Sequence, residues 1–277
     1  MTQGKDSGAH RGSGAGQAHR AGRWSTAITT TTDERVFVRG VALDDAIGRD
    51  SFPAMLLRLW RGDDVTVDEA DLLGACLVAS IDHGSLSPSA LVTRTIASTR
   101  AAPMSGLAGG ILAFGELHGA VVSRAMRVLA SAPDDGDLDA WARGVFEAER
   151  AAARRLPGIG HRWHHHDLRA ERLLQVALPL SNGRREAAVR ALAAQVSRHS
   201  GKPVPVNIDG ALAVALTALR LDPAYGDFLF AIARSFGLAA HFVEEQARER
   251  PMRMIDPTAA HYDGAFVPGV EPEEADS

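Results

Sequence analysis

The chain has 277 residues, of which 45% are hydrophobic and 23% charged, and this composition excludes disorder throughout and favours a folded globular protein. The 30 basic against 34 acidic side chains give a net charge of −4, which excludes a cationic field over the whole protein for nucleic acid. The single Cys76 excludes a disulfide framework and any multi-cysteine metal site, and it fits a reducing compartment.

The N-terminal part of the chain contains little helical patterning. Residues 1–23 are rich in Gly, Ser, Ala and His and contain no apolar run, which predicts a disordered leader without a secretion signal. Residues 25–40 are β-branched and partly alternating around Asp33 and Glu34, which predicts a short strand pair or an extended lead-in. The least polar stretch, residues 101–115, contains four glycines and falls short of the ~20 apolar residues that a membrane span needs.

From residue 52 onward the spacing of apolar residues is helical almost to the end of the chain. A helix is predicted over residues 52–60, a capping box at residues 66–69 opens a second helix, and Pro88 opens a third that runs to about residue 98. Further helices are expected over residues 105–132 (two, with a break), 138–155, 169–177, 186–199, 210–219 and 222–249. The expected fold class is therefore all-α with a short N-terminal β element.

Four short segments place ionisable residues in glycine-rich or apolar surroundings: SIDHG (80–84), GELHG (115–119), GIGHR (158–162) and NIDG (207–210). Histidine and aspartate together supply acid, base and hydrogen-bonding groups at neutral pH, and neighbouring glycines allow a ligand to approach the backbone. Taken singly, each segment also has a structural explanation, namely a capped helix end or a surface histidine. For Asp209 that explanation is the N-cap of the helix over residues 210–219.

The order of these segments, with SLSPSALVTRTIAST, GLAGGILAFG, DLRAE, FAIARSFGLAAHFVEE and ERPM between and after them, resembles the citrate synthase superfamily. Within it, residues 24–40, GIGHR and VNIDG are most similar to citryl-CoA lyases and to the citrate-synthase-like module of ATP-citrate lyase. The resemblance implies a two-domain helical subunit and an obligate dimer. It divides the helical part into a large domain (24–118 and 211–255) and a small domain (119–210), while the Pro, Gly and acidic composition of residues 256–277 predicts a loosely ordered tail.

The resemblance also implies residue roles. Asp209 matches the carboxylate that removes a proton from the acetyl-CoA methyl group, and His118 matches the imidazole that hydrogen-bonds the thioester oxygen. His161 matches the group that donates a proton to the oxaloacetate carbonyl. The side chains that match the substrate-carboxylate cluster are His83, Arg169, Arg234 and Arg250, with Arg250 coming from the partner subunit. Several fixed arginines suit a di- or tricarboxylate because guanidinium binds carboxylate in a bidentate fork.

Other polar segments have weaker implications. Arg94 and Arg124 are candidate contacts for coenzyme A phosphates on charge grounds alone. The run of three histidines at residues 164–166 is interpreted as a solvated loop, and HFVEE (241–245) as a solvated helix face; no metal site is expected. The segment HRWHHHDLR (161–169) is one residue shorter than is usual in the family, Glu116 stands where proline is frequent, and His118 is present although the ATP-citrate lyase module lacks it.

The sequence thus predicts a cytoplasmic enzyme that cleaves citryl-CoA reversibly to acetyl-CoA and oxaloacetate. It needs no bound cofactor, since the coenzyme A thioester is a substrate. The alternatives are a short citrate synthase, a methylcitrate-type synthase, or a non-catalytic acyl-CoA-binding subunit. The expected partners are these small molecules, a second copy of the chain or a higher oligomer, and a separate citryl-CoA synthetase, with neither nucleic acid nor membrane.

Overall fold

A computed structural model of the chain describes residues 25–161, 166–254, 256–259 and 261–264. The chain divides into two compact units, residues 1–47 and residues 48–277. The predicted leader, residues 1–23, lies outside the described residues, as does much of the predicted tail. The predicted division of the helical part into a large and a small domain stays a prediction.

The first unit contains an antiparallel sheet of three short strands in the order β1 (Thr29–Thr31), β2 (Val36–Val38) and β3 (Val41–Ala42), followed by α1 (Leu43–Ala46). The predicted strand pair is confirmed as β1 and β2. The third strand follows a tight turn at Arg39 and Gly40, which have φ values of 49° and 80°. Two consecutive residues of positive φ are typical of the hairpin turns that match the twist of antiparallel strands.

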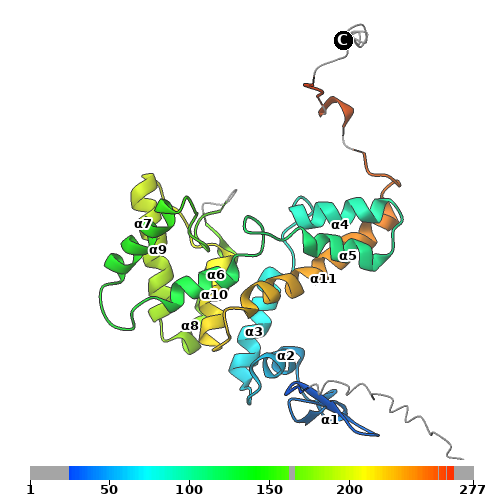
Figure 1. Cartoon of the computed structure of the whole chain (residues 1–277), viewed down its shortest axis with the longest axis horizontal. Helices are drawn as coiled ribbons and strands as arrows, with labels where there is room; N and C mark the ends of the chain where they lie inside the picture. Colours follow the sequence, from blue (N-terminus) through cyan, green and yellow to red (C-terminus); the bar gives the residue numbers. More distant parts are fainter. Residues whose placement is uncertain (1–24, 162–165, 255, 260, 265–277) are drawn as a thin grey trace, which may run out of the picture. The chain divides into compact units, whose positions relative to one another are not determined.

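The second unit is helical, which confirms the expected fold class (Figure 1). Its helices are α2 (Phe52–Arg61), α3 (Val67–Ser80), α4 (Pro88–Ser98), α5 (Pro103–Leu112), α6 (Val122–Ala130), α7 (Leu138–Ala151), α8 (Leu168–Ser181), α9 (Arg184–Ser200), α10 (Ile208–Ala218) and α11 (Tyr225–Arg248), with a 3-10 turn at Pro257–Ala259. The last long helix begins at Tyr225 rather than at residue 222, because Asp222 caps a preceding turn: its Oδ1 accepts the N–H of Ala224 at 2.8 Å.

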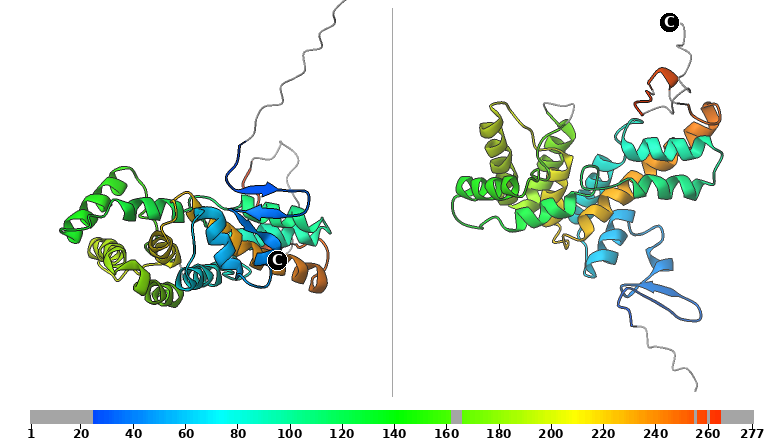
Figure 2. Two further views of the ribbon diagram at one scale, coloured as in Figure 1. Left: turned by 90° about the horizontal axis from the view of Figure 1, so that it is seen from below. Right: turned by 45° about the horizontal axis from the view of Figure 1, so that its top comes forward.

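Helix α10 forms the centre of the core. Its residues from Gly210 to Leu216 are buried, and it packs against α8, α6, α3 and α9 (Figure 2). A helix that is apolar on all sides is stable only when other elements surround it. Helices α8 and α10 pack against each other, and the charges of Asp167 and Arg169 at the start of α8 act on Asp209 in the first turn of α10.

Helix α11 packs against α3, α4, α5 and α6. Within the part of the chain that the structure describes, it is also the helix that is long and apolar enough to cross a membrane. Two charged side chains, Arg234 and Glu245, nevertheless lie buried along it, at 2% and 1% exposure. Its neighbours and its buried charges are those of a core helix of this fold.

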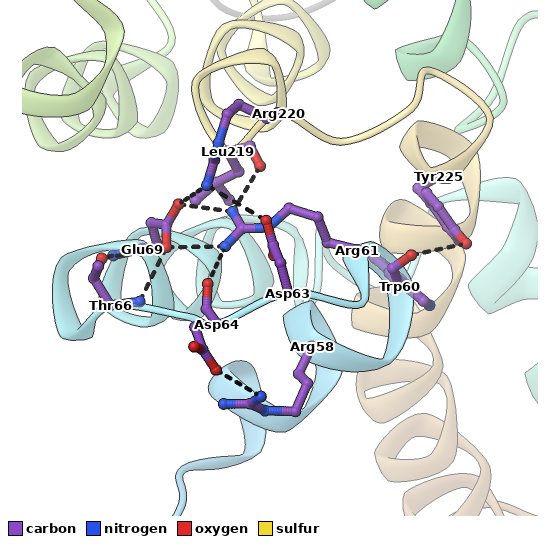
Figure 3. A network of polar contacts seen from close by, with 10 residues as sticks. All are labelled: Arg58, Trp60, Arg61, Asp63, Asp64, Thr66, Glu69, Leu219, Arg220 and Tyr225. Atoms are coloured by element: carbon purple, nitrogen blue, oxygen red, sulfur yellow. Dashed lines mark hydrogen bonds and ion pairs between the residues drawn. The ribbon is translucent and has the colours of Figure 1, made fainter. Parts of the chain in front are cut away.

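A network of polar contacts joins the α2–α3 connection to the α10–α11 connection (Figure 3). The predicted capping box is confirmed, because Glu69 accepts the N–H of Thr66 and Thr66 accepts the N–H of Glu69. Arg61 binds Glu69 at 2.7 Å and also donates to the carbonyl oxygen of Leu219 at 3.1 Å, while Arg220 reaches Glu69 at 3.0 Å. The hydrogen bond from Arg61, opposed by burial, lowers the pKa of Glu69 to about 2. The network therefore anchors the connection between α10 and α11.

Candidate active site

Asp209 lies in the first turn of α10, and its neighbours hold it there. The N-cap is Asn207, whose Oδ1 accepts the N–H groups of Asp209 at 3.0 Å and Gly210 at 3.3 Å. The interpretation of Asp209 as an N-cap is therefore wrong, because the position two residues earlier satisfies the helix end. The carboxyl group of Asp209 is left for another role.

The GIGHR segment is tied directly to the residues before Asp209. Asn207 donates its backbone N–H to Gly158 O at 3.0 Å and its side-chain amide to Gly160 O at 2.8 Å. Gly158 and Gly160 have φ values of 78° and 91°, and a Cβ on Gly158 would lie 2.6 Å from the Cα of Gly210. Both positions favour glycine because other side chains disfavour this conformation, and at Gly158 the close approach of the two backbones also leaves no room for a Cβ. His161 is thereby held beside the start of α10.

The environment of Asp209 changes its acidity. Burial raises the pKa of its carboxyl group to about 6, although the charges of Arg169 and Arg234 oppose the increase. Asp167 and Asp227 add to the increase by like-charge repulsion. A carboxyl group that titrates near neutral pH can serve as a base in one direction of a reaction and as an acid in the other.

Arg169 begins α8 and is fixed by the residue that caps this helix. The buried Asp167 accepts the N–H groups of Arg169 and Ala170, and its carboxylate pairs with the Arg169 guanidinium at 3.0 Å. Across the site, Arg169 Nη1 donates to His83 Nδ1 at 3.2 Å, and the His83 and His161 rings lie edge to face at 5.6 Å. The structure thus brings together His83, His161 and Arg169.

The contact with Arg169 determines the tautomer of His83. Arginine has no acceptor, so Nδ1 of His83 accepts and the ring proton lies on Nε2. Partial burial, together with the positive charges of Arg169 and Arg234, lowers the pKa of His83. A neutral His83 therefore presents an N–H donor from Nε2.

Arg234 supplies a second buried positive charge. Its Nε donates to Ser80 O at 3.1 Å, and its guanidinium lies over the ring of Phe230 at 5.0 Å. Burial lowers the pKa of Arg234, and the charges of Asp82 and Asp209 act on it from beyond ion-pair distance. Among the described residues no carboxylate lies within 4.0 Å of this guanidinium, so a carboxylate of a ligand would balance a charge that is costly to bury alone.

His118 is placed by a different set of contacts. Its Nε2 lies 3.3 Å from the backbone N–H of Ser89 and 2.9 Å from Ser89 Oγ, at the start of α4. A backbone N–H can only donate, so Nε2 accepts and the ring proton of the neutral imidazole lies on Nδ1. Phe114 packs against His118 at 5.3 Å and against Phe230 at 5.6 Å, which connects His118 by side-chain packing to the ring beneath Arg234.

Residues 26–255 match the family model described as the citrate synthase C-terminal domain. The chain belongs to the citrate synthase family. It is similar to the structure of citryl-CoA lyase from Hydrogenobacter thermophilus, with a TM-score of 0.79 and 30% identity, over 91% of this chain and 97% of that one. It is also similar in fold to an ATP citrate lyase from Methanothrix soehngenii in complex with citrate and coenzyme A, with a TM-score of 0.76 and 16% identity, over 99% of this chain and 48% of that one.

The curated relatives are citrate synthases and ATP-citrate synthases. The putative citrate synthase 2 of Mycobacterium tuberculosis is 28% identical over 214 residues, which cover 75% of this chain and 55% of the relative. The chain spans about half the length of the citrate synthases it matches, and a smaller share of the ATP-citrate synthases. Family membership makes it a citrate synthase family enzyme.

The remaining predicted residues of this citrate synthase family site lie apart from the cluster. Arg250 is exposed after α11, and the described contacts do not bring it to His83, Arg169 or Arg234, so its role in a partner subunit stays a prediction. Arg94 binds the carboxylate of Glu245 at 2.8 Å, and Arg124 pairs with Glu149 and Glu116. The coenzyme A contacts predicted for Arg94 and Arg124 also remain untested.

The interpretation of HFVEE as a solvated helix face is wrong at two positions. Glu245 is buried between Arg94 and Arg253, and the side chain of His241, with 15% exposure, contacts Asp82 at 3.2 Å. The face is covered because the chain after α11 turns back to Ser98, where Met252 donates its N–H, and because Ile81 and Asp82 pack against α11 at Gly237. In the histidine run, residues 164 and 165 lie outside the described residues and His166 is exposed.

Sequence reasoning missed four residues that support the site: Ser89, Asp167, Asn207 and the Asp82 partner of His241. Asp167 and Asn207 carried a usable signal, since each is an Asp or Asn just before a helical pattern. Ser89 carried none, and Asp82 belongs to the SIDHG segment but carried no signal of its contact with His241, because the two partners lie 29 and 159 residues away.

Proposed function

We propose that the protein is a citryl-CoA lyase, which converts citryl-CoA reversibly to acetyl-CoA and oxaloacetate. The observation that carries this proposal is the carboxyl group of Asp209, with its pKa raised to about 6, set among the charges of Arg169 and Arg234. Carbon acids next to a thioester need a base aimed at carbon, and oxo acids need fixed cations for their carboxylates. This site offers both, because Asp209 and Arg169 lie in the first turns of α10 and α8 and Arg234 lies on α11.

In the cleavage direction, His161 accepts the proton of the citryl hydroxyl group as the carbonyl of oxaloacetate forms. The carbon–carbon bond breaks, and its electron pair passes to the thioester as an enolate. Asp209, in its protonated form, then delivers a proton to the methylene carbon and gives the methyl group of acetyl-CoA. In condensation the same groups act in reverse, with Asp209 as base.

Two histidines act as donors in this mechanism. The Nδ1–H of His118 is directed to the thioester oxygen on which negative charge develops, and removing such a donor typically costs on the order of 10²–10³ in rate. The Nε2–H of His83 contributes to binding of the oxo acid together with Arg169 and Arg234. The fixed tautomers of both rings, set by Ser89 and by Arg169, support these roles.

The lyase direction is favoured over the synthase by the structural similarity to citryl-CoA lyase, which extends over nearly the whole of both chains. A citrate synthase would go on to hydrolyse the thioester and release free coenzyme A. A methylcitrate-type enzyme would differ by one methyl group in the acyl pocket, which is worth only ~1–3 kcal/mol of discrimination.

The proposal includes a homodimer in which Arg250 of each subunit completes the site of the other. Large apolar side chains are exposed on the outer faces of α4, α5 and α11, which is typical of a surface that another subunit covers. They are Leu91, Val92, Met104, Ile111, Leu112, Phe236 and Val243. Light scattering should return twice the mass of one chain, and a monomeric enzyme with full activity would contradict this part of the proposal.

The function is tested by incubating the purified protein with citryl-CoA, and separately with acetyl-CoA and oxaloacetate, while chromatography follows products and a thiol reagent follows free coenzyme A. Conversion of citryl-CoA to acetyl-CoA and oxaloacetate without thiol release supports the lyase. Thiol release together with citrate shows a synthase instead. No conversion in either mixture contradicts both, and the variant Asp209→Asn is the control for contaminating activity.

A further inference from the structure

One face of α11 contacts three successive residues of the segment that carries His83. Arg234, Gly237 and His241 are spaced by three and four positions, so they lie on the same side of the helix. Their partners are Ser80, Ile81 and Asp82, in the same order. We call Gly237 and His241 the seat residues.

At Gly237 the two backbones approach closely. A Cβ at this position would lie 2.5 Å from the carbonyl oxygen of Ile81 and 2.9 Å from Oδ1 of Asp82. The shorter of these distances is about 1 Å less than the separation of carbon and oxygen atoms in ordinary van der Waals contact. The close approach depends on glycine for reasons of space, since Gly237 has ordinary helical dihedral angles.

At His241 the segment is held by its side chain. His241 Nε2 donates to Oδ1 of Asp82 at 3.2 Å, and the other carboxylate oxygen of Asp82 accepts the N–H of Gly84 at 2.9 Å. Asp82 therefore joins the residues on both sides of His83 to α11. Burial opposes ionisation of Asp82, but the hydrogen bond from Gly84 and the charge of His241 lower its pKa, so the carboxylate is ionised.

Fixing the backbone on both sides of His83 fixes where its ring can lie. The ring faces α8, where Arg169 donates to its Nδ1 at 3.2 Å. Arg234 is one turn from Gly237 on α11 and holds Ser80 O at 3.1 Å. The same helix face therefore sets the separation between His83 and the buried guanidinium of Arg234.

We propose that Gly237 and His241 are positioning residues for the oxo-acid half of the active site. They seat residues 80–82 on α11 and so hold His83 at the distance from Arg169 and Arg234 that a dicarboxylate requires. The identity of the ligand rests on the function proposed above, whereas the seating of the segment does not. A misplacement of about 1 Å at a site of this kind can cost about 10²-fold in function.

The first test compares Gly237→Ala with Gly144→Ala. Gly144 lies within α7, where an added Cβ meets nothing within 4 Å, so it is a matched change with no steric consequence. Calorimetry should show that oxaloacetate binding is weakened at least about tenfold in Gly237→Ala, a loss of about 1.4 kcal/mol in binding free energy. Binding of coenzyme A should be unchanged. Gly144→Ala should bind both as wild type does. Equal oxaloacetate affinity in the two variants would overturn the proposal.

The second test compares His241→Gln, which keeps an N–H donor, with His241→Leu, which has none. The leucine variant should raise the KM for oxaloacetate with little change in kcat, and the glutamine variant should recover most of the loss. Equal effects of both changes would mean that packing alone matters and would overturn the role of His241. These variants also decide the matter if Gly237→Ala does not fold.

Hydrogen exchange of residues 80–84 gives a readout that needs no substrate. Exchange at Gly84 N–H should be faster in Gly237→Ala and His241→Leu than in wild type and Gly144→Ala. If the wild-type protein binds no oxaloacetate, the proposed substrate is wrong, and the exchange measurement still tests whether Gly237 and His241 hold residues 80–82 against α11. Unchanged exchange in both variants would refute it.

Discussion

The Asp209 carboxyl group is expected to reduce the stability of the fold at neutral pH. Its pKa of about 6 lies above the ordinary value of 3.8, so the folded state binds the proton more tightly than the unfolded state does. The stabilising contribution of the protonated form is present below about pH 4 and is lost as the pH rises through about 6. At 1.36 kcal/mol per pKa unit, the ionised carboxylate lowers the free energy of unfolding by about 3 kcal/mol at pH values above about 6.

Replacing Asp209 with asparagine keeps the shape of the side chain and removes its charge. Asp209→Asn should therefore raise the free energy of unfolding by about 3 kcal/mol at pH 8 and by only about 1 kcal/mol at pH 4.5. Turnover of citryl-CoA should fall by orders of magnitude in the same variant. Urea unfolding at both pH values, at equal protein concentration, measures the difference.

The control for this prediction is Asp167→Asn. Asp167 is buried beside Arg169, and its pKa is lowered because the hydrogen bond and charge of Arg169 outweigh its burial. Its replacement should destabilise the protein at pH 8, which is the opposite sign. If Asp209→Asn is no more stable than wild type at pH 8, or if its advantage does not shrink at pH 4.5, the argument from burial is refuted.

Three further predictions concern single contacts. Ser89→Ala removes one partner of His118 and should lower kcat about three- to tenfold, while calorimetry should show unchanged oxaloacetate binding. A larger effect on binding than on kcat would contradict the role of Ser89 in orienting His118. Arg234→Ala should weaken oxaloacetate binding roughly 10- to 100-fold, as loss of a hydrogen bond to a charged group does, and unchanged affinity would exclude it from the site. Glu245→Ala leaves two arginines without their buried partner and should lower the free energy of unfolding by about 3–5 kcal/mol, measured by urea unfolding. The control is Glu244→Ala, which removes a half-exposed carboxylate and should cost less than about 1 kcal/mol. Equal losses of stability in the two variants would count against a buried cluster.

The sequence predicted most of the helices of the second unit because their signals are local. The capping box at Thr66 and Glu69, the proline at the start of α4 and the glycine after α9 act within a few residues of themselves, and the structure contains each of them. The third strand of the first unit was missed since it has two residues, too few for an alternating pattern.

The candidate site was predictable only in part. The motifs around His118, His161 and Asp209 are visible because glycines mark them, and Gly119, Gly158, Gly160 and Gly210 are required there by positive φ or by close contact. The residues that hold these groups, such as Ser89 and His241, act over long separations in the chain. Local patterns contain no information about such partners, so hydrogen-bonding geometry had to identify them.

The distribution of paired charges explains how the fold tolerates its site. Burial penalises the ionised forms of Asp209 and Arg234, which lie on α10 and α11. Strongly paired charges lie outside the site: Arg61 on α2 and Glu69 on α3 anchor the α10–α11 connection, and Glu245 binds two arginines near the end of α11. Buried ion pairs add little net stability, but breaking one is costly, so they hold a helix in one position. The two networks therefore restrain the helices on which the site depends, while Asp209 and Arg234 bear the penalty of burial within the site.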